Sequence, residues 1–321
     1  MTTYKEIFGT NVEVLSSDPA NPVEGQIWYN STSQTLKGYA LVAGSWATAG
    51  PLNTARQQLA GAGTQTAALA FGGTTGSVTG ATESYNGTAW TSSPTSLNTA
   101  RRALGGAGIQ TSALAFGGND PPVANNESWN GTTWTELNDL NTARRILAGC
   151  GASNTAALAF GGFVTTASTG ATETWNGTSW TEVNDLNTAR YGPGGVGTNT
   201  AALAFGGNIP PIVANTETWN GTSWTEVNDL NTARVSSMGA GTQTAAIGGG
   251  GSTGPAFSSN TEIWNGTAWT EVNDMNTARE NLAGAGTNTA ALGFGGSIPA
   301  VTAATEEWSG PAVQTVNITT S

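Results

Sequence analysis

The sequence contains no histidine and only one cysteine among its 321 residues. Histidine is the usual base for serine and cysteine nucleophiles and the commonest metal ligand, so its absence argues against both kinds of site. The lone Cys150 can form neither an intrachain disulfide nor a cysteine metal cage, and we interpret it as a small buried thiol. The glycine run at 248–251 lacks the Lys-Ser/Thr of a phosphate-binding loop. We therefore predict a protein that is not an enzyme and uses no metal or cofactor.

Charge is scarce, and most of it is negative. Only 10% of the residues are charged, the net charge is −11, and there are ten lysines and arginines in all. Phosphate backbones and anionic membrane surfaces both require clustered basic residues, so we expect no nucleic-acid partner. No stretch approaches the ~20 apolar residues of a membrane span, and residues 1–10 lack the apolar run of a signal peptide. Membrane insertion and standard secretion are therefore not expected.

One sequence segment, here called the phrase, repeats along the chain at a nearly constant spacing. Residues 172–190 read Thr-Glu-Thr-Trp-Asn-Gly-Thr-Ser-Trp-Thr-Glu-Val-Asn-Asp-Leu-Asn-Thr-Ala-Arg, and the phrase recurs at 216–234 and 261–279, with more differences at 126–144 and 82–101. Its tetrad Asn-Thr-Ala-Arg begins at positions 53, 98, 141, 187, 231 and 276, a period of 43–46 residues. This period suits one four-stranded blade of a β-propeller, and the Asn-Gly pairs are strong hairpin signals. The sequence therefore predicts an all-β fold of repeated blades.

Residues 1–48 precede the regular repeats and decide the number of blades. Strands are expected there at 26–30, 35–41 and 45–49, with 11–15 as an inner strand. Together with six units over residues 49–321, they give our preferred prediction of seven four-stranded blades. Residues 1–48 would then form a degenerate blade; the alternative is six blades plus an N-terminal anchoring hairpin. In the last unit Val313 takes the place of the fourth-strand tryptophan.

Arginine and glutamate recur in equal numbers at fixed places in the repeat. The arginine of each tetrad is matched by a glutamate two residues before the third-strand aromatic. The arginines are Arg56, Arg101, Arg144, Arg190, Arg234 and Arg279, and the glutamates are Glu83, Glu127, Glu173, Glu217, Glu262 and Glu306. Because a lone buried charge is costly, we predict a ring of buried Arg–carboxylate pairs. The alternative is an arginine ring that grips an anionic ligand in the central channel.

Further carboxylates follow the fourth-strand tryptophan in four repeats. They are the pairs Glu136/Asp139, Glu182/Asp185, Glu226/Asp229 and Glu271/Asp274. Such pairs can ligate Ca²⁺ or serve as an acid and base, but an aspartate in a turn more commonly binds nearby backbone. We prefer the turn interpretation. We also interpret Asn-Gly-Thr as turn chemistry rather than as a glycosylation acceptor.

The combined spacing resembles the kelch repeat over residues 49–321. The shared features are a Gly-Gly doublet, an aromatic about a dozen residues on, a tryptophan about six beyond it, and the arginine that opens the next unit. The hairpin between aromatic and tryptophan is shorter than usual, and the histidine common after the arginine is absent. The resemblance implies a kelch-type β-propeller. A copper oxidase of this architecture would need histidine and is not expected.

A second resemblance concerns residues 21–30, Asn-Pro-Val-Glu-Gly-Gln-Ile-Trp-Tyr-Asn. This segment looks like one that recurs near the start of tail-fibre and other virion proteins of marine bacteriophages. The resemblance implies a virion component such as a fibre, spike or decoration protein, which reaches the exterior by cell lysis. Other virion proteins, or proteins and glycans of a host surface, would be its partners. Oligomers could form through the N-terminal segment.

The loop between the second and third strands varies most from unit to unit. These loops span 74–80, 119–125, 163–170, 208–214, 252–260 and 297–303. Their apolar residues, which we take as candidates for binding, are Pro121, Pro122, Val123, Phe163, Pro210, Pro211, Ile212, Pro255 and Phe257. Variable loops on a rigid frame commonly bind partners, although loops under weak constraint vary as well. We therefore expect a non-enzymatic binding or structural protein; a lectin-like propeller is the second hypothesis and a glycan-acting enzyme the third.

Overall fold

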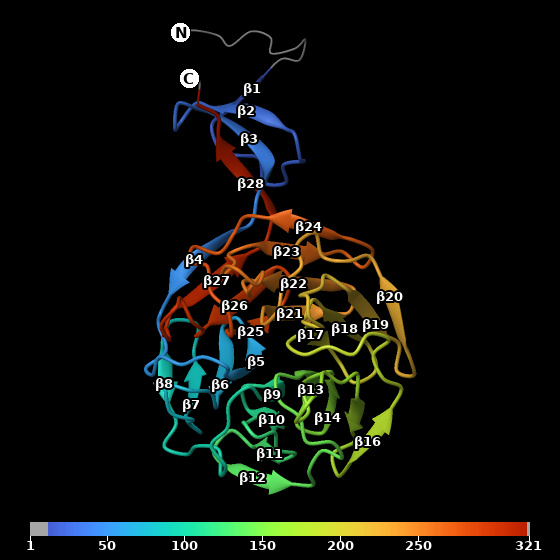
Figure 1. Ribbon diagram of the computed structural model, residues 1–321. Coiled ribbons are helices and arrows are strands. Elements are labelled where there is room, and N and C mark those ends of the chain that lie inside the picture. Colours follow the sequence, from blue (N-terminus) through green and yellow to red (C-terminus); the bar gives the residue numbers. More distant parts are fainter. Residues whose placement is uncertain (1–11, 320–321) are drawn as a thin grey trace. The chain divides into compact units, whose positions relative to one another are not determined.

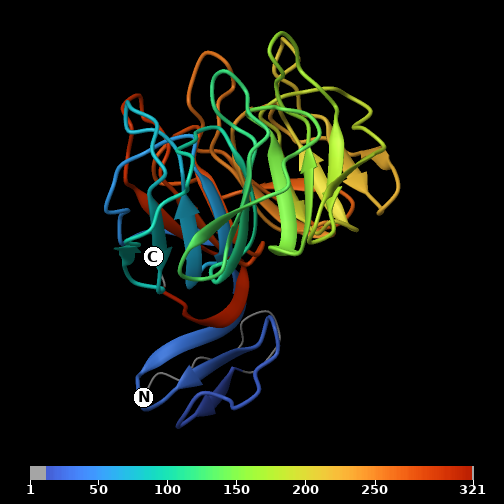
Figure 2. The ribbon, with the colours of Figure 1, turned by 90° about the horizontal axis from the view of Figure 1, so that it is seen from below.

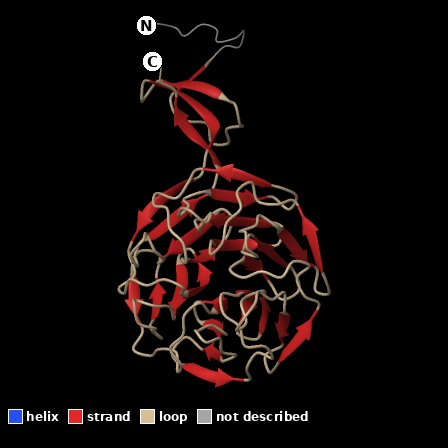
Figure 3. Ribbon diagram, viewed as in Figure 1, coloured by secondary structure: helices blue, strands red, loops and turns tan. Residues whose placement is uncertain are grey.

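The computed structural model describes residues 12–319, and within that range the regular structure is entirely β. Twenty-eight strands form seven four-stranded sheets, which Figure 3 displays as strands joined by loops and turns. The predicted all-β fold of four-stranded repeats is therefore confirmed. Among the described residues, no helix is long and apolar enough to cross a membrane.

The seven sheets belong to two compact units. Six sheets lie in the larger unit, Ser45–Ser309, and the seventh lies in a small unit made of residues 12–44 and 310–319. In the larger unit the inner strands contact one another in a closed cycle, β5–β9–β13–β17–β21–β25–β5. Figure 1 shows these six blades around one axis. The count of seven sheets is thus as predicted, but six of them close the ring, which corresponds to the six-blade alternative.

Each blade runs from an inner to an outer strand. The inner strands are β5 (Ala60–Thr64), β9 (Gly105–Ile109), β13 (Ala148–Ser153), β17 (Gly194–Gly197), β21 (Met238–Thr242) and β25 (Ala283–Gly286). The second strands are β6 (Ala67–Phe71), β10 (Ser112–Phe116), β14 (Ala156–Phe160), β18 (Ala202–Phe205), β22 (Ala245–Gly249) and β26 (Ala290–Phe294). The third strands are β7 (Thr82–Tyr85), β11 (Asn126–Trp129), β15 (Thr172–Trp175), β19 (Thr216–Trp219), β23 (Thr261–Trp264) and β27 (Thr305–Ser309). The outer strands are β8 (Trp90–Ser92), β12 (Trp134–Leu137), β16 (Trp180–Val183), β20 (Trp224–Val227), β24 (Trp269–Val272) and β4 (Ser45–Ala49).

The ring is closed by a strand from the opposite end of its sequence. Strand β4 pairs with β27, so that Trp46 lies opposite Trp308, and the prediction that residues 45–49 join a seventh blade is corrected. The reason is the indole of Trp46, which donates to Thr261 Oγ1 at 3.0 Å and fills the place of an outer-strand tryptophan. Val313 lacks such a ring, and its strand lies in the small unit instead.

The small unit is a sheet of order β1-β2-β3-β28. Its strands are β1 (Glu13–Leu15), β2 (Ile27–Asn30), β3 (Thr35–Val42) and β28 (Ala312–Asn317). The hairpin β2–β3 confirms the expected strands at 26–30 and 35–41. The strand expected at 11–15 is β1, which pairs in parallel with β2; Asn11 itself lies outside the described residues. Asp18 accepts hydrogen bonds from Trp28 and Asn30 and pairs with Lys37 at 2.8 Å.

Aromatic contacts hold adjacent blades of the ring together. The phenylalanine that ends a second strand packs on the outer-strand tryptophan of the next blade, with ring centroids 4.9 to 5.0 Å apart. Strand β22 ends in Gly249 instead, and there Met238 and Met275 pack with Trp46. Other repeats carry Ala or Gly and Leu at these two methionine positions. Flexible methionines thus fill the space that the missing phenylalanine leaves.

Candidate functional site

The predicted arginine–glutamate pairs are formed in all six blades. Their side chains are at most 3% exposed, and Arg101–Glu127, Arg144–Glu173, Arg190–Glu217 and Arg279–Glu306 approach within 2.9 to 3.2 Å. Arg56–Glu83 and Arg234–Glu262 are also in contact. Burial lowers the pKa of each of these arginines, and the charge of the partner glutamate opposes that shift.

The tetrad supplies the other partners of the buried carboxylate. In one blade Glu173 accepts hydrogen bonds from the backbone and side-chain nitrogens of Asn141, at 2.7 and 2.9 Å, and from Thr142 N at 3.3 Å. Arg144 also donates to the carbonyls of Ala159 and Ala171. The Asn-Thr-Ala-Arg tetrad is therefore a structural motif that joins consecutive blades. Its guanidinium groups are engaged inside the blades, and the axial channel is lined by other residues.

Small residues line the axial channel. At one end each inner strand contributes a triplet such as Gly61-Ala62-Gly63, around a hollow of about 100 Å³. Cys150 stands where the neighbouring blades have Ala107 and Val196, and burial raises the pKa of its thiol. The interpretation of Cys150 as a buried thiol is thus confirmed. This channel wall offers backbone groups and small side chains to a ligand.

The opposite end of the axis is a ring of six different residues. One residue from each blade lies at the same repeat position, two residues after the tetrad arginine. These residues are Gln58, Ala103, Ile146, Gly192, Ser236 and Asn281. All six have left-handed backbones, with φ between 52° and 64°. Each backbone N–H donates to the carbonyl of the preceding member at 2.7 to 3.1 Å, so the hydrogen bonds form a closed circle. We call these residues the axial mouth.

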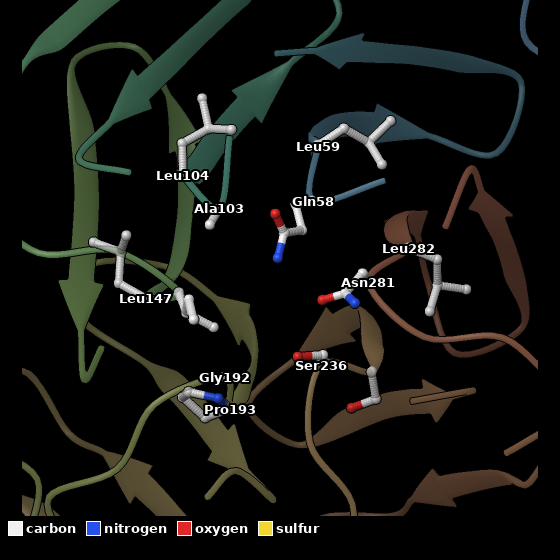
Figure 4. Close-up of a pocket in the computed structure, with 12 residues that line it drawn as sticks. Gln58, Leu59, Ala103, Leu104, Leu147, Gly192, Pro193, Ser236, Asn281 and Leu282 are labelled. Carbon is white, nitrogen blue, oxygen red and sulfur yellow. The ribbon is translucent and has the colours of Figure 1, made fainter. Parts of the chain in front are cut away.

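The axial mouth surrounds a hollow of about 110 Å³, which Figure 4 shows from close by. Three adjacent blades contribute the polar residues Ser236, Asn281 and Gln58. The other three blades contribute Ala103, Ile146 and Gly192. In Figure 4 the amide of Gln58 extends into the opening, with Asn281 beside it. One half of the rim is therefore polar and the other half has no side-chain hydrogen-bonding group.

The mouth is continuous with the variable loops. The residue before each mouth residue is Gln57, Arg102, Arg145, Tyr191, Val235 or Glu280. In five blades this residue forms a backbone bridge to the first loop residue after Gly-Gly, as in Arg145↔Phe163 and Tyr191↔Asn208. In the sixth, Asn119 N donates to Arg102 O at 2.7 Å. These six dipeptides and the six loops form one surface, the variable face, whose loops project from one side of the ring in Figure 2.

The predicted binding residues lie on four successive blades of the variable face. Pro121, Pro210, Pro211 and Pro255 are exposed, whereas Pro122, Val123, Phe163, Ile212 and Phe257 are half-buried. Their part in binding stays a prediction. The six dipeptides are not among the residues predicted to bind. The signal for them is the change of residue type from repeat to repeat directly after each tetrad arginine.

One part of the variable face gathers charged and aromatic side chains from three blades. Asp120 Oδ2 lies 3.3 Å from a guanidinium nitrogen of Arg145 and 3.8 Å from one of Arg102. The Arg145 guanidinium lies over the ring of Phe163 at 5.5 Å, and Phe163 meets Tyr191 edge-on, with centroids 5.5 Å apart and planes at 87°. We call these five residues the Arg–aromatic cluster. No other blade repeats it, because each member occupies a variable position.

The carboxylates that follow the outer-strand tryptophans have structural partners. Asp139, Asp185 and Asp229 each accept a hydrogen bond from the first backbone N–H of their blade's third strand, at 3.0 to 3.2 Å. That N–H lies thirteen residues upstream. The hydrogen bond therefore connects the turn that holds the aspartate to the third strand of the sheet, and it is not a bond within that turn. Within residues 12–319, no three His, Cys, Asp or Glu side chains gather as a metal site would require.

No protein-family model matches this chain, and no curated protein sequence matches it. The assignment to a repeat β-propeller therefore rests on the four-stranded sheets, their closed cycle of inner strands and the repeated Arg–Glu and Trp–Thr contacts.

Proposed function

We propose that the ring is a non-enzymatic recognition module that binds its ligand on the variable face. The observation that supports this proposal is that the differences between repeats are concentrated in the axial mouth and the loops, while the buried pairs stay the same. The tetrad arginine and its glutamate are present in all six blades, whereas the six positions of the axial mouth hold six residue types. A frame that stays constant while one surface changes is typical of binding proteins.

The variable side chains stand on a fixed backbone. The circle of backbone hydrogen bonds fixes each mouth residue, and the bridges to the loops fix the residue before it. A surface ordered before the ligand arrives loses less conformational entropy on binding. The variable face thus suits recognition of an extended surface by many modest contacts.

The biological setting that we propose is a virion of a bacteriophage, in which this protein is a kelch-type fibre, spike or decoration component. Support comes from the resemblance of residues 21–30 to segments of such proteins and from the near-identical tandem repeats. The ligand would then be another virion protein or a component of the host surface, met after release by lysis.

Carbohydrate binding is the second candidate, and the Arg–aromatic cluster favours it. Half-buried aromatic rings beside polar groups supply both an apolar surface and hydrogen bonds for a sugar. We do not extend the proposal to glycan cleavage, because Asp139, Asp185 and Asp229 are engaged by backbone N–H groups at equivalent places in three blades.

The test is a binding screen of the purified protein on immobilised bacterial surface polysaccharides and intact bacterial cells. The variant replaces loop 208–214 by Gly and Ser. A matched control replaces residues 198–200, the turn between β17 and β18 of the same blade. We expect the loop variant to lose binding and the turn variant to keep it. Binding that survives replacement of each of the six loops and dipeptides in turn would refute a role for the variable face.

A further inference from the structure

The ring has two arginines that its repeated pairs do not use. Residues 45–309 contain eight arginines and no lysine. Six of these arginines are the buried tetrad residues, with fully buried side chains. The remaining two, Arg102 and Arg145, are 36% and 25% exposed. The accessible arginine charge of the ring is thus concentrated at one place on the variable face.

The two arginines share a single carboxylate. Both approach the same oxygen, Oδ2 of Asp120, at 3.8 and 3.3 Å, and Asp120 is itself 47% exposed. Well-formed charge-assisted hydrogen bonds are about 2.7–2.9 Å long, so neither contact is a strong one. Each guanidinium carries about five N–H donors in one plane. The cluster therefore has one positive charge in excess and keeps donors for an incoming anion.

An aromatic wall stands beside these donors. The ring of Phe163 lies under the Arg145 guanidinium at 5.5 Å, and the planes of the Phe163 and Tyr191 rings are nearly perpendicular, at 87°. A cation placed over an aromatic face is attracted by the ring, which favours this position of the Arg145 guanidinium. The backbones are fixed as well, because Arg145 and Phe163 exchange two hydrogen bonds, at 3.0 and 2.7 Å.

We infer that the Arg–aromatic cluster binds an acidic sugar, with the sugar carboxylate on Arg102 and Arg145 and the C–H face of the sugar ring against Phe163 and Tyr191. This inference rests on the proposed function and names the ligand class for one part of the variable face. A planar carboxylate matches the fork of a guanidinium, and an aromatic ring matches the flat apolar face of a sugar. An acidic peptide would use the arginines but would leave the aromatic wall without a partner. Thr165 and Thr166, in the same loop as Phe163, are exposed.

The experiment uses the full chain on an array of oligosaccharides that carry glucuronic, galacturonic or sialic acid. Each oligosaccharide is printed beside its carboxyl-reduced neutral form, and an Asp/Glu-rich peptide is included. The variants are Arg145→Gln, Arg102→Gln and Phe163→Ala, each checked for folding by thermal unfolding. The control, Lys37→Gln, removes one positive charge from the small unit. We expect acidic glycans to bind, and each cluster variant to weaken binding by about tenfold or more while the control leaves it unchanged.

The outcomes separate this inference from the proposed function. Equal binding of the acidic and reduced forms, or undiminished binding by both Arg145→Gln and Arg102→Gln, would overturn the acidic-sugar inference and leave recognition by the variable face standing. Binding to the acidic peptide alone, or to no glycan on the array, would overturn it as well. In those cases the loop-replacement screen on cells decides the proposed function independently.

Discussion

Two sets of arginines in the same ring have opposite surroundings. Arg144 is fully buried, meets Glu173 at 3.2 Å and has its equivalent in every blade. Arg145, the next residue, is 25% exposed and meets Asp120 at 3.3 Å, and only one other blade has arginine there. The difference teaches that residues repeated in every blade of the ring pair with one another inside it, whereas residues that change lie on its surface, where we propose that recognition takes place.

The largest effect is expected at a buried pair. Glu173→Gln removes the negative charge next to Arg144 and leaves an uncompensated buried cation, which costs about 3–5 kcal/mol of the free energy of unfolding. The control is Glu182→Gln, because Glu182 is the exposed cross-strand partner of Glu173. That change should stay within about 0.5 kcal/mol. Urea denaturation of both variants measures the difference, and equal losses would contradict the structural role of the pair.

A smaller loss is expected where the inner strands crowd. A Cβ at Gly149 would lie 2.4 Å from the ring of Phe116 and 2.8 Å from the backbone oxygen of Gly106. Overpacking of this kind costs about 1–3 kcal/mol, so Gly149→Ala should lower the midpoint of urea denaturation. An unchanged midpoint would mean that the inner strands have room that the structure does not show.

Restoring a repeat should stabilise the ring modestly. Five outer-strand tryptophans donate their indole N–H to a threonine hydroxyl of the preceding blade, at 2.9 to 3.1 Å. For Trp180 the corresponding residue is Asn126, and the indole nitrogen has no partner among the described residues. Asn126→Thr should supply the missing hydroxyl and raise the free energy of unfolding by about 0.5–1.5 kcal/mol, as measured by denaturation. A loss of stability would show that the Asn126 side chain matters more than the indole contact.

The smallest effect is expected at an exposed ion pair in the small unit. Hydrogen bonds from Lys37, Asn30 and Trp28 lower the pKa of Asp18 to about 2. Because this pKa is depressed on folding, the stabilisation is present above the unfolded value of about 3.9 and is lost as pH falls through about 2. An NMR titration should find the Asp18 carboxyl near 2 and find it higher in Lys37→Gln. An ordinary pKa of Asp18 in the unchanged protein would contradict a stabilising role for these hydrogen bonds.

Much of the frame could be predicted from the sequence, because the repeat ties each feature to a fixed position. Equal numbers of arginines and glutamates at fixed repeat positions predict the buried pairs, and the Asn-Gly pairs predict the hairpins. Ring closure was missed, since the partner of residues 45–49 lies more than 250 residues away in the chain. Trp46 carried the signal, because Gly44-Ser45-Trp46 matches the start of an outer strand in the other blades.

The Arg–aromatic cluster could not be predicted in the same way. Its members come from the dipeptides and loops of three blades, and no periodic pattern connects Asp120 with Arg145 or Phe163 with Tyr191. Contacts between loops of different blades depend on how the blades are placed. The repeat therefore predicts which residues vary, and the folded ring shows which of them meet.

The most direct test of the division between frame and face makes the six dipeptides identical. In this variant Gln-Asn replaces residues 57–58, 102–103, 145–146, 191–192, 235–236 and 280–281. Asparagine tolerates the left-handed backbone of the axial mouth, so the free energy of unfolding should stay within about 2 kcal/mol of that of the natural protein. The variant should bind none of the polysaccharides or cells that the natural protein binds. A folded variant that still binds them would contradict the assignment of recognition to the dipeptides, and with the six loop replacements also binding it would contradict the assignment to the variable face as a whole.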